Sequence, residues 1–352
     1  MRQRRLRPPF RAAGFTPRGA FATAHHNPNR HARSKPCPKL SHPLPNPSAP
    51  LRALCDLCDL CVHLPLPALP SPVPSPRFTF LGTGTSSGIP VIACDCPTCT
   101  SDDPRDARLR TGAALEWTDP DGKPRALLID ATPDLRAQVL RHNLRRCDAI
   151  LFTHNHVDHT FGLDEVRRFN AVMQAPIDIY ADAHTLDSLR RVYRHVFEPE
   201  KNANASFVAR LIPNQAHPAR PFHLHGLRFT PIPLLHGRLP VLGWRIEQAP
   251  GTSPNPSGDD LFPLAYCTDV SGIPPEAWPL LDGVQTLALG ALRFRHHPTH
   301  FTLNQALEAA GRIGARQTWF VHMSHEVRHA EVDPTLPEGV RLAYDGLILG
   351  PS

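Results

Sequence analysis

The segment THNHVDHT contains four side chains that can bind a metal ion, namely His154, His156, Asp158 and His159. The apolar run AILF precedes them and predicts a buried strand that ends where the histidines begin. Alternate residues of an extended segment project to one side, so His154 and His156 can hold one ion together. Asp158 and His159 follow as the chain turns and can reach a second ion. Imidazole and carboxylate ligands suit zinc, manganese or iron.

Three later strand ends each carry one further candidate ligand. The runs PIPLLH, LAYCTD and TWFVH end with His236, Asp269 and His322. A single histidine in such a place is more often structural, and a histidine-rich surface loop is the alternative interpretation of the first motif. Together, however, five histidines and two aspartates are enough for two ions, with Asp269 placed to bridge them. Asp130 ends an earlier predicted strand, and we expect it to orient a ligand imidazole.

A second group of metal-binding side chains lies in the run CDCPTC, at Cys94, Cys96 and Cys99. Three thiolates do not complete a tetrahedral shell, so a zinc site here requires a fourth ligand elsewhere in the chain. Nine cysteines and no visible secretory segment predict a reducing, cytoplasmic location, where clustered thiols favour metal over disulfides. A disulfide or a redox site is the alternative. A similar run, whose role stays open, contains Cys55, Cys58 and Cys61.

The composition divides the chain into an N-terminal extension, residues 1–76, and a folded domain, residues 77–352. The extension holds sixteen of the 41 prolines, a composition that predicts disorder. A wrongly assigned start site, upstream of the true one, is the other interpretation of this segment. Its eleven basic and two acidic residues give +9, whereas the whole chain is +6, so the folded part is about −3. This mildly acidic domain predicts no stable nucleic-acid partner, and no apolar run is long enough to predict a membrane span.

The folded part mixes strands and helices along its length. The glycines of GTGTSSG follow GxGxxxG rather than the dinucleotide fingerprint GxGxxG, which argues against a Rossmann site. Several strands fall in each half, which predicts a four-layer αββα sandwich, and the Pro/Ser/Gly run 250–258 predicts a loop. The predicted strands cover residues 78–81, 112–118, 124–130, 148–154, 177–182, 227–236, 241–248, 263–269, 317–324 and 341–350. The predicted helices cover residues 132–144, 162–172, 185–197 and 302–315.

The motif HxHxDH, followed in order by His, Asp and His at later strand ends, resembles the metallo-β-lactamase superfamily of hydrolases over essentially all of residues 77–352. The resemblance implies an αββα fold and two divalent ions, manganese or zinc. It assigns to the first ion His154, His156, His236 and bridging Asp269. It assigns to the second ion Asp158, His159, Asp269 and His322.

One branch of this superfamily, resembling the phosphoribosyl 1,2-cyclic phosphate phosphodiesterase, matches two more segments. Its CxCxxC segment and a histidine just beyond the last catalytic one share a structural zinc, which here implies Cys94, Cys96, Cys99 and His325. A histidine in a context like PTHFTLNQA resembles the general acid of that branch, which implies this role for His300. A surface histidine in the run RHHPTH is the alternative.

The resemblance implies a metal-dependent phosphodiesterase that cleaves a small, cyclic phosphodiester. A hydroxide bridging the two ions would attack phosphorus, with Asp158 essential for turnover and His300 protonating the leaving oxygen. The branch also favours a homodimer. One alternative is an RNA-processing nuclease of the tRNA 3′-end type, although no Gly-rich basic arm is visible. Another is a protein like the pyrroloquinoline-quinone biosynthesis B protein, which shares CxCxxC but lacks much of the catalytic set.

Overall fold

The computed structural model describes residues 76–204, 206–248 and 261–350, all within one compact unit, residues 67–352. The expected loop over residues 250–258 lies outside these residues. So do residues 1–75 of the expected N-terminal extension, which include Cys55, Cys58 and Cys61. No helix of the described parts is both long and apolar enough to cross a membrane.

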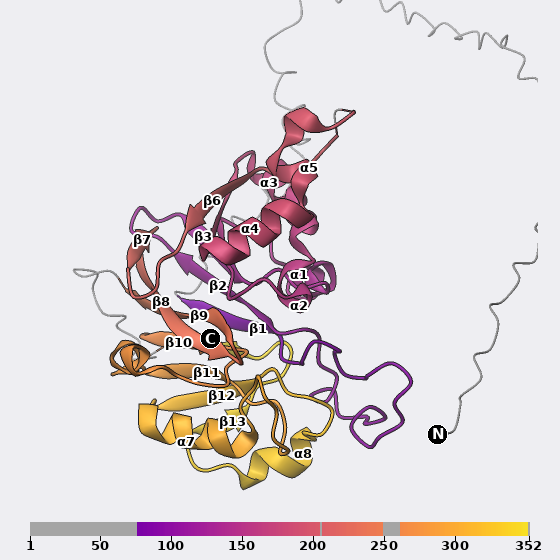
Figure 1. Ribbon diagram of the computed structural model, residues 1–352, viewed down its shortest axis with the longest axis vertical. Helices are drawn as coiled ribbons and strands as arrows, with labels where there is room; N and C mark the ends of the chain where they lie inside the picture. The colour runs from indigo at the N-terminus through magenta and orange to yellow at the C-terminus, as the bar shows by residue number, and fades with distance from the viewer. Residues whose placement is uncertain (1–75, 205, 249–260, 351–352) are drawn as a thin grey trace, which may run out of the picture. The chain divides into compact units, whose positions relative to one another are not determined.

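Two seven-stranded sheets form the centre of the described unit (Figure 1). The first has the order β14-β1-β2-β3-β4-β5-β6 and the second the order β13-β12-β11-β10-β9-β8-β7. The strands of the first sheet are β1 (Arg77–Gly82), β2 (Gly112–Thr118), β3 (Pro124–Ile129), β4 (Ala149–Leu151), β5 (Ile177–Ala181), β6 (Leu211–Gln215) and β14 (Ile348–Leu349). Those of the second are β7 (Phe222–Leu224), β8 (Leu227–His236), β9 (Leu239–Gln248), β10 (Leu264–Cys267), β11 (Thr286–Gly290), β12 (Gln317–Val321) and β13 (Val340–Leu342).

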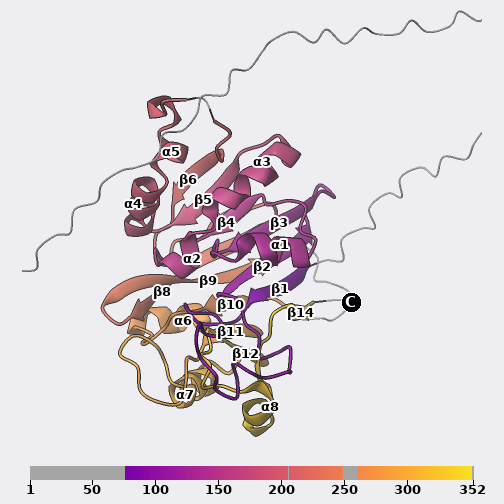
Figure 2. The ribbon, with the colours of Figure 1, turned by 90° about the vertical axis from the view of Figure 1, so that its right-hand side faces the viewer.

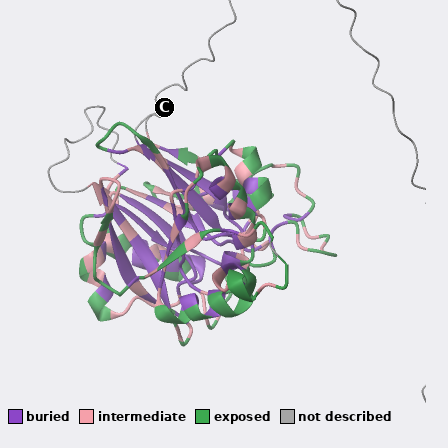
Figure 3. Ribbon diagram, turned by 90° about the horizontal axis from the view of Figure 1, so that it is seen from above, coloured by how far each residue is buried: buried purple, intermediate pink, exposed green. Residues whose placement is uncertain are grey.

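The two sheets pack on each other through a shared apolar core. Phe78, Phe80 and Leu127 of the first sheet and Trp244 and Tyr266 of the second belong to one buried cluster. These side chains alternate with others that face outward, as expected for strands covered on both faces. The strands are accordingly buried along most of their length, whereas the helices expose their outer faces (Figure 3).

Helices cover the outer face of each sheet, which completes the predicted four-layer αββα sandwich (Figure 2). On the first sheet lie α1 (Leu135–Arg141), α2 (Val157–Thr160), η1 (Leu163–Val166), α3 (Arg167–Met173), α4 (Ala183–Val192), α5 (Arg194–Phe197) and η2 (Pro199–Lys201). On the second lie η3 (Pro275–Ala277), α6 (Trp278–Leu281), α7 (Leu303–Ile313), α8 (His329–Val332) and η4 (Asp333–Thr335). Helix α7 is fixed at its start by a capping box between Thr302 and Gln305.

The direction of the strands determines where the candidate ligands meet. Strands β3 and β4 are parallel, so their carboxyl ends lie at the same edge of the first sheet. In the second sheet β9 is antiparallel to both β8 and β10, and β10, β11 and β12 are parallel. Strands β8, β10 and β12 therefore all end at one edge, which is where their terminal histidines and aspartate are placed.

Two predicted elements are wrong in extent, and three strands (β6, β7 and β11) were not predicted. The single final strand expected over residues 341–350 is two short strands, β13 and β14, in different sheets. The chain crosses between them at Gly346, whose φ of 95° favours glycine, while Asp345 accepts hydrogen bonds from Thr83 and Leu109. The helix expected over residues 185–197 begins at Ala183 and breaks at Tyr193, whose φ of −103° and ψ of 41° are not helical. The Tyr193 hydroxyl donates to the Thr160 carbonyl, 2.9 Å away.

Candidate metal centre

Each predicted ligand lies at or just after the end of a strand or in the short helix that follows. Asp130 follows β3, the HxHxDH motif follows β4, His236 ends β8, Asp269 follows β10 and His322 follows β12. Three of these residues have left-handed backbones, with φ of 64° at Asp130, 50° at Asp269 and 59° at His322. Such conformations cost about 1–3 kcal/mol each and cluster at functional sites, so the fold holds these side chains in place against strain.

The first group consists of His154, His156 and His236, whose ligand atoms lie within 4.8 Å of one another. His236 Nδ1 lies 2.6 Å from the carbonyl oxygen of Thr299, which can only accept, so Nδ1 carries the proton. His154 Nδ1 lies 3.0 Å from the Thr153 hydroxyl, and this hydroxyl donates to Asp130. His154 therefore donates from Nδ1 as well. In both rings Nε2 is left with a free lone pair, and His154 Nε2 is buried without a partner.

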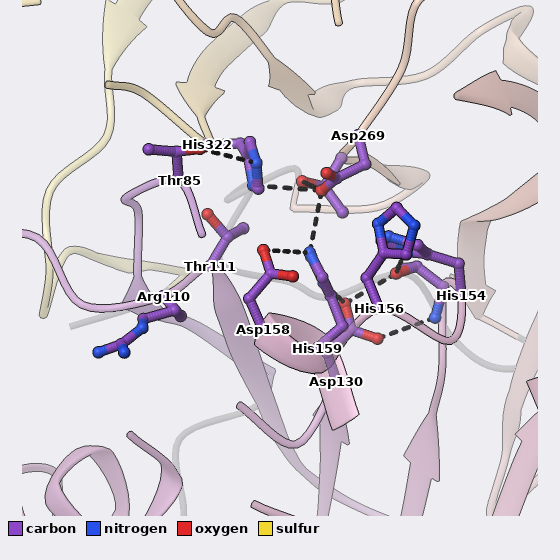
Figure 4. A network of polar contacts seen from close by, with 12 residues as sticks. Thr85, Arg110, Thr111, Asp130, His154, His156, Asp158, His159, Asp269 and His322 are labelled. Atoms are coloured by element: carbon purple, nitrogen blue, oxygen red, sulfur yellow. Dashed lines mark hydrogen bonds and ion pairs between the residues drawn. The ribbon is translucent and has the colours of Figure 1, made fainter. Parts of the chain in front are cut away.

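The second group surrounds His159 (Figure 4). Its Nδ1 donates to Asp130 Oδ2 at 2.7 Å, which leaves the Nε2 lone pair facing inward. Nε2 lies 3.3 Å from Asp158 Oδ2 and 3.1 Å from Asp269 Oδ2, and His322 Nδ1 lies 3.1 Å from the same Asp269 oxygen. Lone pairs of nitrogen and oxygen that converge in this way repel one another unless a cation lies between them. The donor set thus fits a divalent ion.

The electrostatics of the pocket favour positive charge at the same point. Burial alone lowers the pKa of His159, but the carboxylates of Asp269, Asp130 and Asp158 raise it well above its usual value. Burial lowers the pKa of His154 far below its usual value, so this ring stays neutral, the form in which imidazole binds a metal. A metal ion can supply the charge that a proton on His159 would otherwise supply.

Asp269 is the residue that connects the groups. Its carboxylate oxygens belong to one set with His154 and His159 and to another with His236 and His300. The carboxylate is fully buried, and although burial raises its pKa, the neighbouring His322 and His159 hold that pKa well below its usual value. An ionised carboxylate in this position fits the predicted bridge between two ions.

His300 lies beside the centre. Its Nδ1 is 3.7 Å from Asp269 Oδ1, and its ring stacks on that of His322 with centroids 4.9 Å apart. Burial, followed by the charge of His322, lowers the pKa of His300 to about 3. The ring is therefore neutral near pH 7 and offers an N–H donor. To transfer a proton it must first become imidazolium, which requires a nearby negative charge that raises its pKa. The surface-loop alternative does not account for this position, in which the His300 side chain is only 13% exposed.

The three cysteines and His325 form a second, separate group (Cys₃His group). The sulfurs of Cys94, Cys96 and Cys99 lie 3.2, 3.5 and 3.6 Å from His325 Nδ1. A tetrahedral zinc with ordinary Zn–S and Zn–N bonds has S···N edges of about 3.5 Å. The geometry therefore fits a closed zinc shell, with the amide of Val91 donating to Cys99 Sγ from outside it.

Three residues around the centre were not predicted from the sequence. The Thr153 hydroxyl connects Asp130 to His154, so Asp130 orients two ligand rings rather than one. The Thr299 carbonyl orients His236. Thr85, in the glycine-rich loop after β1, lies 3.3 Å from His322 Nε2. Thr153 and Thr85 adjoin predicted motifs and could have been considered, but a backbone carbonyl leaves no signal in the side-chain pattern.

Comparison with known families agrees with this geometry. Residues 125–323 match the family described as the beta-lactamase superfamily domain, a span of more than half the chain that includes every predicted catalytic ligand. The chain belongs to the beta-lactamase superfamily. It is a hydrolase of the metallo-β-lactamase fold with candidate metal-binding groups, as the sequence predicted.

A solved diphosphatase from the PhnP family is 36% identical, covers 79% of this chain and 98% of its own, and superposes with a TM-score of 0.67. This similarity places the chain in the PhnP branch of the superfamily, which is the branch that the sequence resembles. Zinc-bound PqqB from Methylobacterium extorquens covers 78% of this chain and 100% of its own with a TM-score of 0.60. Its identity is 20%, so it shares the fold alone.

An octanoyltransferase from Porphyromonas gingivalis is 34% identical over 273 residues, which are 77% of this chain. The match covers 51% of that protein, so the present chain spans about half the length of this curated relative. The name of the relative refers to a protein of about twice the matched length. The centre described above contains candidate metal ligands.

Proposed function

We propose that the protein is a metal-dependent phosphodiesterase that hydrolyses a small phosphodiester, with a ribose cyclic phosphate as the first candidate. The observation that carries the proposal is the convergence of unpartnered imidazole nitrogens and carboxylates around Asp269. It occurs in a chain of which 79% aligns with a PhnP-family diphosphatase. This donor set suits hard divalent ions, and phosphoric esters need such positive charge.

In this proposal one divalent ion, manganese or zinc, would be held by His154, His156 and His236. The other would be held by Asp158, His159 and His322, and Asp269 would be available to both. Two such ions supply the charge that neutralises phosphate oxygens and the acidity that generates hydroxide from water near neutral pH. Asp130 keeps the proton of His159 on Nδ1, and the Thr299 carbonyl does the same for His236, so both Nε2 atoms point at the centre.

The reaction replaces one P–O bond by another. The oxygen of water forms a bond to phosphorus as the bond to the leaving oxygen breaks, and the leaving oxygen keeps the electron pair of that bond. We assign to His300, whose Nδ1 lies 3.7 Å from Asp269 Oδ1, the donation of a proton to this oxygen. The attacking water gives up a proton, and solvent water restores the proton of His300. The negative charge of a phosphodiester raises the pKa of the adjacent imidazole, so substrate binding itself would prepare the acid. Such proton transfer contributes about 10²–10⁴ in rate.

A diphosphate is the second candidate substrate, because the similar solved structure is named a diphosphatase. The same residues would act on a P–O–P linkage, in which the leaving group is a phosphate and needs a proton less than an alkoxide does. Dependence on His300 therefore distinguishes the two substrate classes.

The test is a panel of substrates offered to the metal-loaded full chain: a ribose cyclic phosphate, a dinucleoside diphosphate, a tRNA precursor and a thioester. Fastest turnover of the cyclic phosphate, with strong loss in His300→Ala, is the expected result. Preference for the diphosphate with little loss in His300→Ala would support the second candidate. Turnover of only the tRNA precursor or only the thioester would refute the proposal.

A further inference from the structure

The loop of residues 293–302 carries the groups that place two parts of the centre. Its Thr299 carbonyl orients His236, and its His300 lies beside Asp269. Two backbone hydrogen bonds, both 3.0 Å long, join the ends of the loop. Leu303 N–H donates to the Arg293 carbonyl, and Leu292 N–H donates to the Phe301 carbonyl. The position of this loop therefore affects a candidate metal ligand and the candidate acid together.

Arg293 shapes the loop from inside. Its guanidinium donates to the carbonyl oxygens of Arg295 and His296, both at 3.3 Å, and its side chain is 26% exposed. The remaining nitrogen, Nη1, lies 3.5 Å from Glu326 Oε1. Arg295, which is largely exposed, adds a two-pronged contact to the same carboxylate, at 2.7 and 3.1 Å. Glu326 thus fixes the start of the loop through both arginines.

Glu326 directly follows His325, the histidine of the Cys₃His group. The amide of Glu326 is held by the Ser324 hydroxyl at 3.2 Å, so the segment between His322 and Glu326 is ordered locally. Moving His325 necessarily moves Glu326. The connection runs from the cysteines to His325, along the chain to Glu326, and by an ion pair to Arg293, which lies in the loop that carries His300.

We propose that Glu326 is a positioning residue that couples the Cys₃His group to the 293–302 loop, so that the occupancy of this group affects the placement of His300. The catalytic part of this inference rests on the proposed function. A single exposed ion pair contributes little, but here a bidentate contact and a partly buried arginine share one carboxylate, the kind of network that is worth more. The expected effect is about fivefold, which is the upper end of the range measured for ion pairs near a protein surface.

The first experiment measures amide hydrogen exchange of the 293–303 segment in the full chain. Glu326→Gln removes the charge and keeps the shape, and Glu331→Gln is the matched control, because Glu331 pairs with Arg328 outside the loop. Protection should fall about fivefold in Glu326→Gln and in Cys96→Ser, and no further in the double variant, whereas Glu331→Gln should match the wild type. Unchanged protection in Glu326→Gln, or additive losses in the double variant, would overturn the coupling.

The second experiment compares leaving groups. Bis(p-nitrophenyl) phosphate releases a stable anion, whereas a ribose cyclic phosphate releases an alkoxide that needs a proton. Glu326→Gln should lower kcat on the cyclic phosphate about fivefold. It should lower kcat less on the nitrophenyl substrate, where only the change at His236, transmitted by the Thr299 carbonyl, contributes. Equal losses on both substrates would indicate a general structural effect and refute the positioning role. Absence of turnover in the wild type would refute the proposed function instead, while the exchange experiment would still decide the coupling.

Discussion

Replacement of Asp130 tests most directly the hydrogen bonds that orient the candidate metal ligands. Its Oδ1 accepts from the Thr153 amide at 2.8 Å, and its Oδ2 accepts from the Thr153 hydroxyl and from His159 Nδ1. In Asp130→Asn the amide oxygen must stay opposite the Thr153 amide, so the NH₂ group takes the place of Oδ2. It then donates to His159 Nδ1, and the proton of that ring moves to Nε2, the atom that faces Asp158 and Asp269.

The expected loss follows from this change of tautomer. Replacing a group that orients a metal ligand typically costs 10–100-fold in metal affinity. Here the Thr153 contact to His154 is disturbed as well, so we expect the upper end, about 100-fold or about 2.8 kcal/mol. The fold itself should not suffer, because burial raises the pKa of Asp130 and its charge is therefore costly in the metal-free protein.

The assay is metal titration of the full chain by calorimetry at pH 7.5, with thermal unfolding of the metal-free protein alongside. Asp345→Asn is the matched control, since Asp345 is also a buried aspartate but bonds Thr83 and Leu109 instead of a ligand ring. Affinity should fall in Asp130→Asn and stay within twofold in the control. The melting temperature of metal-free Asp130→Asn should not fall below that of the wild type. Unchanged affinity in Asp130→Asn would refute the argument that this carboxylate sets the tautomer of His159.

Three further predictions follow from the same contacts. Burial raises the pKa of Asp345 to about 6, so the native state holds this proton more tightly than the unfolded chain does. The free energy of unfolding should therefore be highest below about pH 4 and fall by about 3 kcal/mol as pH rises through 6. Urea unfolding of Asp345→Asn should show no such dependence on pH. Cys96→Ser should lower the metal content by one equivalent and the stability by about 2–4 kcal/mol, the range for losing a cross-link, while the catalytic ions stay bound; retention of all metal by elemental analysis would exclude the Cys₃His site. His300→Ala should keep the metal content and slow turnover of a cyclic phosphate by about 10²–10⁴; full activity on this poor leaving group would exclude the acid role.

The ligand side chains of the centre could be predicted from the sequence because each one ends a strand or follows its end. Strands that run in the same direction end at the same edge of a sheet, so His236, Asp269 and His322, which end or follow strands of one sheet, lie together. The HxHxDH motif follows β4 of the other sheet, which packs on this one. The αββα layers followed from the mixture of strands and helices in both halves, with outward faces left for helices.

What escaped prediction depends on contacts between distant segments. Glu326 and Arg293 are 33 residues apart, and neither carries a motif. The Thr299 carbonyl acts through the backbone, so its role depends on how the 293–302 loop closes. The split between β13 and β14 occurs because the chain changes sheets at Gly346, whereas its apolar pattern continues without interruption. The strand propensity of a segment does not show which sheet the segment joins.

The most direct test of the central claim is hydrolysis of bis(p-nitrophenyl) phosphate by the full chain, stripped with a chelator and reloaded with manganese or zinc, beside Asp158→Ala. The account predicts no turnover in the stripped protein, turnover on reloading, and its loss in Asp158→Ala, whose carboxylate faces His159 Nε2. A folded protein that holds both catalytic ions and still leaves the phosphodiester intact would contradict the account.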